Sequence, residues 1–388
     1  MPSEMIPYID ALTGTKVTQL TNHKCHSHHL YFTNPGWHDR NRRLLFGSDR
    51  GGRTNLFSIE LATGYITQIT DADMPDETLF LFASVNPCRE EAYFFRGRKL
   101  IAVNLITRKE RLLYEAPDNF DVNMTNVSAD GRYVCTGIYE RAGGFKADLL
   151  RGYVGFREYF EQHPLSRIVR VPVDGGAAET LHEERNWIGH VNTSPTQPHL
   201  MTFCHEGPWD LVQQRIWGLD MNTGKVWKIR PQDDGMVCGH EYWFADGLRI
   251  GFHGRSRAVS GRQATYGAIE FDNTDHVEAP FPYDSQHFFS HDLSLIVGDG
   301  SRGHSWDRQG RRDLVMLWQF ENGQFVGPRV LCEHRGSAHV QQTHIHPRFS
   351  PDMKHVLFTS DMTGYGQLYL AELKPFAELP TIEQVWRK

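Results

Sequence analysis

The chain has 388 residues, of which 39% are hydrophobic and 23% charged, and 41 Lys and Arg against 47 Asp and Glu give a formal net charge of -6. This acidic balance disfavours nucleic-acid binding, which needs a basic surface. No apolar run approaches the roughly 20 residues of a membrane span, and the N-terminal residues do not resemble a signal peptide. The six cysteines include no Cys-x-x-Cys pair, which excludes a zinc framework or disulfide scaffold. We therefore expect a cytoplasmic protein that binds neither nucleic acid nor membrane.

Two short phrases recur along the chain at a spacing close to 50 residues. The first is an apolar strand that ends in a Gly- or Asn-containing turn, and it occurs eight times between residues 12 and 372. The second is an aromatic or apolar strand followed by a Ser/Thr-Pro/Asp turn, and it occurs seven times between residues 31 and 352. Short strands separated by such turns at this period indicate four-stranded blades. The pattern predicts an all-β fold, a seven-bladed β-propeller in one domain of residues 1–388.

Two segments depart from the regular repeat. The extra copy of the first phrase near the N-terminus predicts that residues 8–21 supply the outer strand of the last blade, because closing the ring removes exposed sheet edges. One interval is longer because residues 145–163 are inserted, with apolar side chains at near-helical spacing and Pro164 at the end. We expect one short amphipathic helix there, and interpret it as a packing element.

Histidines recur at one position of the second phrase, three residues before the strand aromatic. In a propeller, equivalent positions of the innermost strands lie at one level of the central channel. The alignment therefore predicts that five blades direct imidazoles toward one ring. The residues are His29, His190, His240 and His346, with Gln286 and its neighbour His287 in the sixth blade.

His344 and His346 are two residues apart, so their side chains would lie on the same face of a strand. Two imidazoles on one face are a sound start for a divalent-metal site. Strand alternation would make Gln342 their neighbour, whereas Gln341 could join them only if the backbone turns before His344. The chain has no His-Glu-x-x-His motif or cysteine ligand pattern, so neither a zincin nor a structural zinc site is predicted.

Arg215 begins an otherwise apolar strand after a loop stiffened by the Gly-Pro-Trp sequence at 207–209. An arginine at the channel end of a strand suits a bidentate contact with a carboxylate. The alternative interpretation is a salt bridge to a neighbouring blade. The sequence contains no Gly-x-Ser-x-Gly elbow, P-loop or dinucleotide-binding glycine motif, which excludes those enzyme classes.

Six uncommon strings resemble the oligogalacturonate lyases of polysaccharide lyase family 22, and the resemblance extends nearly end to end. The strings are Trp187-Ile-Gly-His190, Cys204-His-Glu-Gly-Pro-Trp209, Gln214-Arg-Ile-Trp217, Cys238-Gly-His-Glu241, Val297-Gly-Asp-Gly300 and Gln341-Gln-Thr-His-Ile-His346. The resemblance implies a seven-bladed propeller with manganese in its central channel. It also implies an enzyme of pectin catabolism that cleaves digalacturonate and unsaturated digalacturonate.

The same resemblance implies roles for individual residues. The metal ligands correspond to His287, Gln341, His344 and His346, the Brønsted base to His240, and a catalytic arginine to Arg215. The stretch 284–292 departs from the family pattern, which leaves His291 as an alternative to His287. Candidates for binding the second sugar are His190, His205, Arg255, Arg302 and His304.

These residue types suit a metal-assisted β-elimination. The reaction removes the proton on C5, next to the uronate carboxylate, expels the glycosidic oxygen on C4 and gives 4-deoxy-5-keto-uronates. A divalent cation on the carboxylate would act as a Lewis acid, and neutral His240 would act as the general base. The resemblance implies Mn²⁺, and the ligand types would also admit zinc, nickel or cobalt.

A second hypothesis is a non-catalytic propeller of the TolB or WD type that serves as a protein-binding platform. Such a protein would have the same repeats, but mixed residues would face its channel in place of a ring of imidazoles. The sequence therefore favours an enzyme whose partner is a small acidic oligosaccharide, with no obligate protein partner implied.

Overall fold

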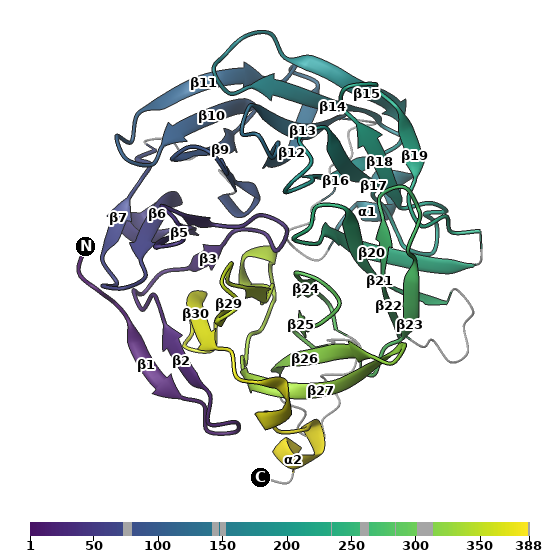
Figure 1. Cartoon of the computed structure of the whole chain (residues 1–388). Coiled ribbons are helices and arrows are strands. Elements are labelled where there is room, and N and C mark those ends of the chain that lie inside the picture. The colour runs from purple at the N-terminus through teal and green to yellow at the C-terminus, as the bar shows by residue number, and fades with distance from the viewer. Residues whose placement is uncertain are drawn as a thin grey trace.

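The computed structural model describes residues 1–72, 80–141, 147, 153–233, 235–256, 264–283, 285–300 and 313–386. Within these ranges the chain forms seven antiparallel sheets around a central axis, each running from an inner to an outer strand (Figure 1). The prediction of an all-β, seven-bladed propeller is confirmed. None of the described helices is long and apolar enough to cross a lipid bilayer.

Five blades consist of four consecutive strands each, and the first blade carries one additional short strand. The first blade contains β3 (Ser27–His29), β5 (Arg43–Ser48), β6 (Asn55–Glu60) and β7 (Ile66–Gln68), with β4 (Trp37–His38) paired to β5. The second contains β8 (Ser84–Val85), β9 (Glu91–Arg96), β10 (Lys99–Asn104) and β11 (Glu110–Glu115). The third contains β12 (Phe120–Val127), β13 (Tyr133–Glu140), β14 (Leu165–Pro172) and β15 (Glu179–Arg185).

The next three blades repeat this arrangement around the ring. The fourth blade contains β16 (Ile188–Thr193), β17 (Leu200–His205), β18 (Ile216–Asp220) and β19 (Val226–Lys228). The fifth contains β20 (Met236–Trp243), β21 (Arg249–Ser256), β22 (Ala264–Glu270) and β23 (Val277–Pro280). The sixth contains β24 (Phe288–Ser290), β25 (Ile296–Gly298), β26 (Leu314–Glu321) and β27 (Gln324–Glu333).

The seventh blade joins segments from opposite ends of the sequence. It contains β28 (Arg348–Phe349), β29 (His355–Ser360), β30 (Gln367–Glu372), β2 (Lys16–Gln19) and β1 (Ile6–Ile9). Val17 pairs with Ala371, so β2 lies beside β30, and β1 is the outermost strand (Figure 1). The N-terminal segment thus adds a two-stranded hairpin where the sequence predicted one outer strand.

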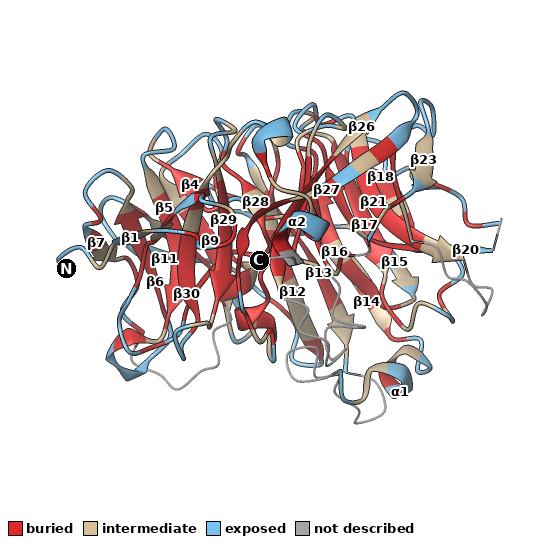
Figure 2. Cartoon of the chain, turned by 90° about the horizontal axis from the view of Figure 1, so that it is seen from below, coloured by how far each residue is buried: buried red, intermediate tan, exposed pale blue. Residues whose placement is uncertain are grey.

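Apolar packing between neighbouring blades also closes the ring. Leu357 of β29 and Leu368 of β30 belong to the same buried cluster as Leu44 and Phe57 of the first blade. Figure 2 shows that burial is concentrated in the strands, whereas exposed residues lie mainly in the connecting turns at both faces. The last and first blades therefore share one core, in addition to the hydrogen bonds between β2 and β30.

The predicted insertion lies between β13 and β14, in the third blade. Its helix α1 spans Phe156–Phe160, which is shorter than the predicted helical stretch, and residues 145, 146 and 148–152 lie outside the described residues. The helix begins after Gly155, whose φ of 74° is left-handed, and left-handed His163 precedes the proline that ends the segment. Buried Tyr159 packs on Trp187 of the fourth blade, with 4.8 Å between ring centroids.

A second short helix, α2 (Ile382–Trp386), was not predicted from the sequence. Its residues Ile382 and Val385 are buried in the same apolar cluster as Val330 of β27. The helix therefore covers part of the outer strand of the sixth blade. Its five residues are too few to show a helical period, which explains why the sequence pattern did not reveal it.

Replacing Val17 with aspartate should destabilise the ring by about 3 to 5 kcal/mol, because an unpaired charge would be buried where the first and last segments pair. Val17 is fully buried in an apolar cluster, so the carboxylate could not reach water without disturbing the packing of β2. The free energy of unfolding in urea measures the effect.

The matched control is Lys16→Ala. Lys16 lies next to Val17 in β2 and forms an exposed ion pair of 2.7 Å with Glu372. Its loss should cost less than about 1 kcal/mol. Equal effects of the two substitutions would contradict the importance of burial at this junction.

Candidate active site

Three channel histidines lie at irregular points of the backbone. His190, His240 and His346 have left-handed φ angles of 43°, 49° and 44°, which non-glycine residues rarely adopt. In β16 and β20 the left-handed histidine coincides with a shift in the pairing to the next strand, which is a β-bulge. A bulge bends the strand and redirects a side chain. The backbone is therefore shaped specifically where these imidazoles enter the site.

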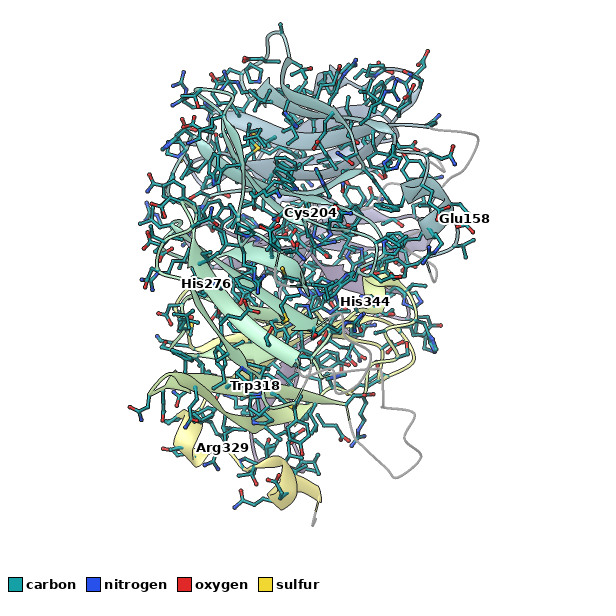
Figure 3. All side chains as sticks on the ribbon, turned by 90° about the vertical axis from the view of Figure 1, so that its right-hand side faces the viewer. Glu158, Cys204, His276, Trp318, Arg329 and His344 are labelled. Atoms are coloured by element: carbon teal, nitrogen blue, oxygen red, sulfur yellow. The ribbon has the colours of Figure 1, made fainter. Side chains whose placement is uncertain are left out.

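Three of the predicted ligands form a compact cluster. His287, His344 and His346 are buried, and one ring nitrogen from each lies within 4.8 Å of those of the other two. Figure 3 shows the propeller edge-on, with His344 toward the face that carries α1. The stretch 344–347 is irregular, because β28 begins only at Arg348. The two histidines therefore converge through a bend at His346, and the expectation that they share one face of a strand is wrong.

Gln341 is the amide that the structure buries beside this segment. Residues Gln341–Thr343 form a short 3₁₀ turn, so the backbone does turn before His344. The Gln341 side chain donates from Nε2 to the hydroxyl of Tyr153, at 3.2 Å. Its Oε1 is buried and has no hydrogen-bond partner among the described residues, and the same is true of Nε2 of His346. A buried amide oxygen and a buried imidazole nitrogen, both without hydrogen-bond partners, fit a site that binds a cation.

Asp299 fixes the orientation of His287. The Asp299 Oδ2 lies 2.7 Å from Nδ1 of His287, and its Oδ1 accepts a hydrogen bond from the His287 backbone N–H at 2.8 Å. Burial opposes ionisation of Asp299, but His287 holds the pKa of this carboxyl below its ordinary value. A carboxylate on one ring nitrogen leaves the other nitrogen as the ligand atom and makes it a stronger donor.

His291, the alternative ligand, lies elsewhere. Its ring is 6.1 Å from that of Phe349, and its backbone carbonyl accepts a hydrogen bond from Ala245. His291 follows β24, whereas His287 precedes it, so the strand separates the two imidazoles. The structure thus places His287, and not His291, with the other imidazoles.

His240 borders the cluster of His287, His344 and His346 from the fifth blade. Its ring centroid lies 4.9 Å from that of His287, and its Nδ1 lies 2.7 Å from Nε2 of His253. Burial, together with the neighbouring His287 and His253, lowers the pKa of His240 well below its ordinary value. His240 is therefore neutral near pH 7, as a general base must be.

Arg215 lies in a buried network of charges. Its Nε donates to Glu241 Oε2 at 3.1 Å, and its Nη1 donates to Glu206 Oε1 at 3.2 Å. The ring nitrogens of His190 lie 3.5 and 3.7 Å from the same two glutamates. Glu241 belongs to the fifth blade and Arg215 to the fourth. The alternative interpretation, a salt bridge to a neighbouring blade, therefore describes the Arg215–Glu241 contact.

This network contains a second set of potential ligands, namely His190, Cys204 and Glu241. The guanidinium of Arg215 already supplies a cation to this group, and burial raises the pKa of the Cys204 thiol well above its ordinary value. A protonated thiol next to an arginine is a poor environment for a metal ion. We therefore interpret the group as an ion-pair network.

Among the channel histidines predicted from the repeat, His29 has a structural role. Its Nε2 donates to the backbone carbonyl of His346 at 2.8 Å, and its Nδ1 lies 2.6 Å from the hydroxyl of Thr359. Both ring nitrogens are therefore satisfied by protein atoms. The hydrogen bond to the carbonyl of His346 supports the left-handed backbone at that residue.

Of the remaining candidates, His205 and Arg255 belong to the described residues. His205 bonds through Nε2 to Glu184 at 2.8 Å and lines a cavity of about 690 Å³ with Glu206 and Trp217. The Arg255 guanidinium lies over the ring of Trp209, at 5.3 Å from its centroid. The candidates Arg302 and His304 lie outside the described residues.

Comparison with known proteins identifies relatives of this propeller. The family model of the oligogalacturonate lyases matches residues 1–376. An oligogalacturonate lyase of Dickeya dadantii is 30% identical over 380 residues, which cover 94% of this chain and 95% of the relative. The chain belongs to the oligogalacturonate lyase family. The prediction of this family, and with it of a polysaccharide lyase, is confirmed.

Other members show the same extent of similarity. An oligogalacturonide lyase of Pectobacterium atrosepticum is 30% identical over 386 residues, covering 96% of this chain and 97% of the relative. A solved structure of an oligogalacturonate lyase in complex with manganese superposes with a TM-score of 0.84 at 27% identity, covering 100% of this chain and 98% of that one. The oligogalacturonate lyase fold thus extends over the whole chain.

Sequence reasoning missed several residues of this family member's site. Glu206, Glu241 and Asp299 lie inside the strings that carried the resemblance, but no role was assigned to them. Because each contacts a histidine or arginine that was singled out, a search for acidic partners within those strings would have found them. His253 lies outside every string, and its pairing with Gly239 of the neighbouring strand becomes visible only in the structure.

The stability of this oligogalacturonate lyase family member should fall as the pH is lowered below about 6.5. Burial lowers the pKa of His29 to about 3, so the unfolded chain binds a proton there that the folded chain excludes. Folding stability from neutral His29 is fully present above the unfolded pKa and decreases from about pH 6.5 toward about pH 3.

His29→Gln tests this, because glutamine does not titrate. The variant should be less stable at pH 7 and should lose stability on acidification less steeply, by up to about 1.4 kcal/mol per pH unit. Urea unfolding between pH 7 and pH 5 gives both slopes. Identical slopes would show that His29 titrates normally in the folded protein.

Proposed function

We propose that the protein cleaves short oligogalacturonates, such as digalacturonate and unsaturated digalacturonate, by β-elimination with Mn²⁺ as its cofactor. The observation that carries the proposal is the buried cluster of His287, His344 and His346, with a neutral fourth imidazole, His240, in ring contact with it. Membership of the oligogalacturonate lyase family and the similarity to a solved lyase in complex with manganese support both the substrate and the metal.

The proposed ligands are His287, Gln341, His344 and His346. Three imidazoles and one amide oxygen are neutral, so a divalent ion would keep its full charge. When bound, the cation supplies Lewis-acid neutralisation of the uronate carboxylate, which makes the C5 proton more acidic. Asp299 is the one carboxylate that contacts a proposed ligand in the described part of the chain, and it holds His287 in place.

His240 is the proposed general base. The C5–H bond breaks as its proton moves to His240, the released electron pair forms the C4–C5 double bond, and the C4–O bond breaks. The departing oxygen takes up a proton, and the unsaturated product opens to the 4-deoxy-5-keto form. A neutral imidazole with a low pKa suits this step once the C5 proton has been acidified.

Arg215 is proposed to assist by its charge. Glu241 accepts from Nε and Glu206 accepts from Nη1 of the guanidinium, which leaves Nη2 as the donor for the predicted contact with the substrate carboxylate. The same positive charge helps to keep His240 and His190 neutral, since it lowers the pKa of both histidines in addition to the effect of burial. The protein-binding platform is not favoured, because the family match and the imidazole cluster both indicate catalysis.

Substitution of His287 with alanine should abolish retention of Mn²⁺, because the cluster would lose a ligand and its oriented carboxylate partner. His291→Ala is the matched control, since His291 is four residues away and does not join the cluster. Elemental analysis after gel filtration measures the bound metal. Retention of the metal by His287→Ala, or its loss from His291→Ala, would contradict the assigned site.

His240→Ala should lower kcat on digalacturonate by ~100- to 10,000-fold while metal content stays normal, because proton transfer by a positioned side chain contributes this much. The absorbance of the unsaturated or ketonic product measures turnover. If the variant keeps more than about a tenth of wild-type kcat, the loss is much smaller than this range. His240 is then not the base, and His190 would be the next candidate.

The pH profile supplies a second measurement on the same residue. Because the pKa of His240 lies below its ordinary value, kcat/KM should stay constant down to about pH 6.5 and fall only in more acidic solution. The direction follows from protonation, which removes the lone pair that accepts the C5 proton. An acid limb centred above pH 7 would contradict a buried, neutral base.

A further inference from the structure

His253, which has no role in the mechanism above, forms the closest contact of the proposed base. Its Nε2 lies 2.7 Å from Nδ1 of His240, and the two ring planes are inclined by 11°. His253 is buried in β21, and burial lowers its pKa to about 3. A hydrogen bond of this length needs one donor and one acceptor, so a single proton lies between the two facing nitrogens.

The backbone is shaped to make this contact. His253 pairs with Gly239, so in regular strands His240 would lie on the opposite face of the sheet from His253. The bulge and the left-handed φ of His240 bring its ring to the same side as His253.

The absence of a side chain at Gly239 leaves room for Trp209 to cover the two histidines. A Cβ atom on Gly239 would lie 2.5 Å from the ring of Trp209, and this ring packs edge-on against both histidines. The glycine, the bulge and the tryptophan together fix the two imidazoles relative to one another.

Two tautomeric arrangements satisfy the hydrogen bond, and only one is compatible with catalysis. If Nε2 of His253 donates, then neutral His240 carries its proton on its own Nε2 and has no lone pair to offer a substrate. If Nδ1 of His240 donates, its Nε2 is unprotonated and can accept the C5 proton. The position of one proton therefore decides whether His240 can act as a base.

We propose that His253 is a positioning residue that accepts the hydrogen bond from Nδ1 of His240 and thereby holds Nε2 of His240 unprotonated. The inference rests on the proposed function, because it assumes that His240 removes the C5 proton. When that proton arrives, His240 becomes an imidazolium and its bond to His253 becomes charge-assisted and stronger. His253 thus favours the charged base after transfer without placing a negative charge beside it before transfer.

The test compares two substitutions of His253. Leucine removes the acceptor, whereas glutamine retains an acceptor oxygen near the position of Nε2. His253→Leu should lower kcat by about 100-fold or more, with KM within about threefold of wild type and metal content unchanged. His253→Gln should restore kcat to within about tenfold of wild type, since the tautomer is again fixed.

A spectroscopic readout separates tautomer control from simple packing. In Zn²⁺-loaded protein labelled with ¹⁵N-histidine, His240 should show a protonated Nδ1 and an unprotonated Nε2 in the wild type and in His253→Gln. In His253→Leu this preference should be lost. His240→Gln identifies the resonances by their absence.

His38→Leu provides the matched control. His38 is also buried, and its two ring nitrogens contact Glu90 and Ser58 at 3.0 and 2.8 Å in the first blade, away from the site. This variant should lose stability and keep the wild-type kcat. It therefore measures the effect of losing buried histidine hydrogen bonds alone.

The possible results distinguish the inference from the proposed function. If wild-type enzyme releases no unsaturated product from digalacturonate, the proposed function is wrong. If the wild type is active but His253→Leu keeps kcat within about threefold, or if His240 in the wild type carries its proton on Nε2, the inference is overturned alone. Should His253→Leu fail to fold, His253→Gln and the wild-type spectrum still decide between the two tautomers.

Discussion

In two regular, paired strands, His240 would lie on the opposite face of the sheet from His253, and the proposed base would lose its closest partner. Left-handed backbone at His240 prevents this, and the same conformation recurs at His190 and His346. Each such residue costs on the order of 1 to 3 kcal/mol. Pairing and packing around the whole ring hold the strands in place, so the site depends on a scaffold that tolerates local strain.

The site gives its two kinds of histidine different partners. His287, a proposed ligand, bonds to the carboxylate of Asp299, which strengthens it as an electron donor. His240, the proposed base, bonds to the neutral ring of His253, which leaves its pKa low. Exchanging these partners would harm both functions, because a carboxylate beside the base would favour its protonation at neutral pH. The partner of each imidazole therefore distinguishes ligand from base where the residue type does not.

The repeat pattern was sufficient for the fold, because each blade has its own strand and turn signals and seven copies reinforce one another. The alignment of histidines across the blades also identified His240, His287 and His346 as channel residues. Strand alternation was misleading where the backbone departs from the strand period. It favoured Gln342 over Gln341, which enters through a 3₁₀ turn, and it placed His344 and His346 on one strand face, although the backbone at His346 is left-handed. Contacts between distant strands, such as His253 with His240, carry no signal along the sequence. Family resemblance supplied roles that spacing alone could not assign.

The pairing of β2 with β30 has a consequence for the newly synthesised chain. The backbone N–H of Leu368 donates to the hydroxyl of Thr21, 347 residues earlier. At about 5 to 20 residues per second, a ribosome needs on the order of 20 to 70 s to make the intervening segment. Throughout that time the N-terminal hairpin has no sheet to join and exposes strand edges to aggregation. His344 and His346 are translated shortly before β30, so ring closure and completion of the imidazole cluster belong to the same late stage of folding.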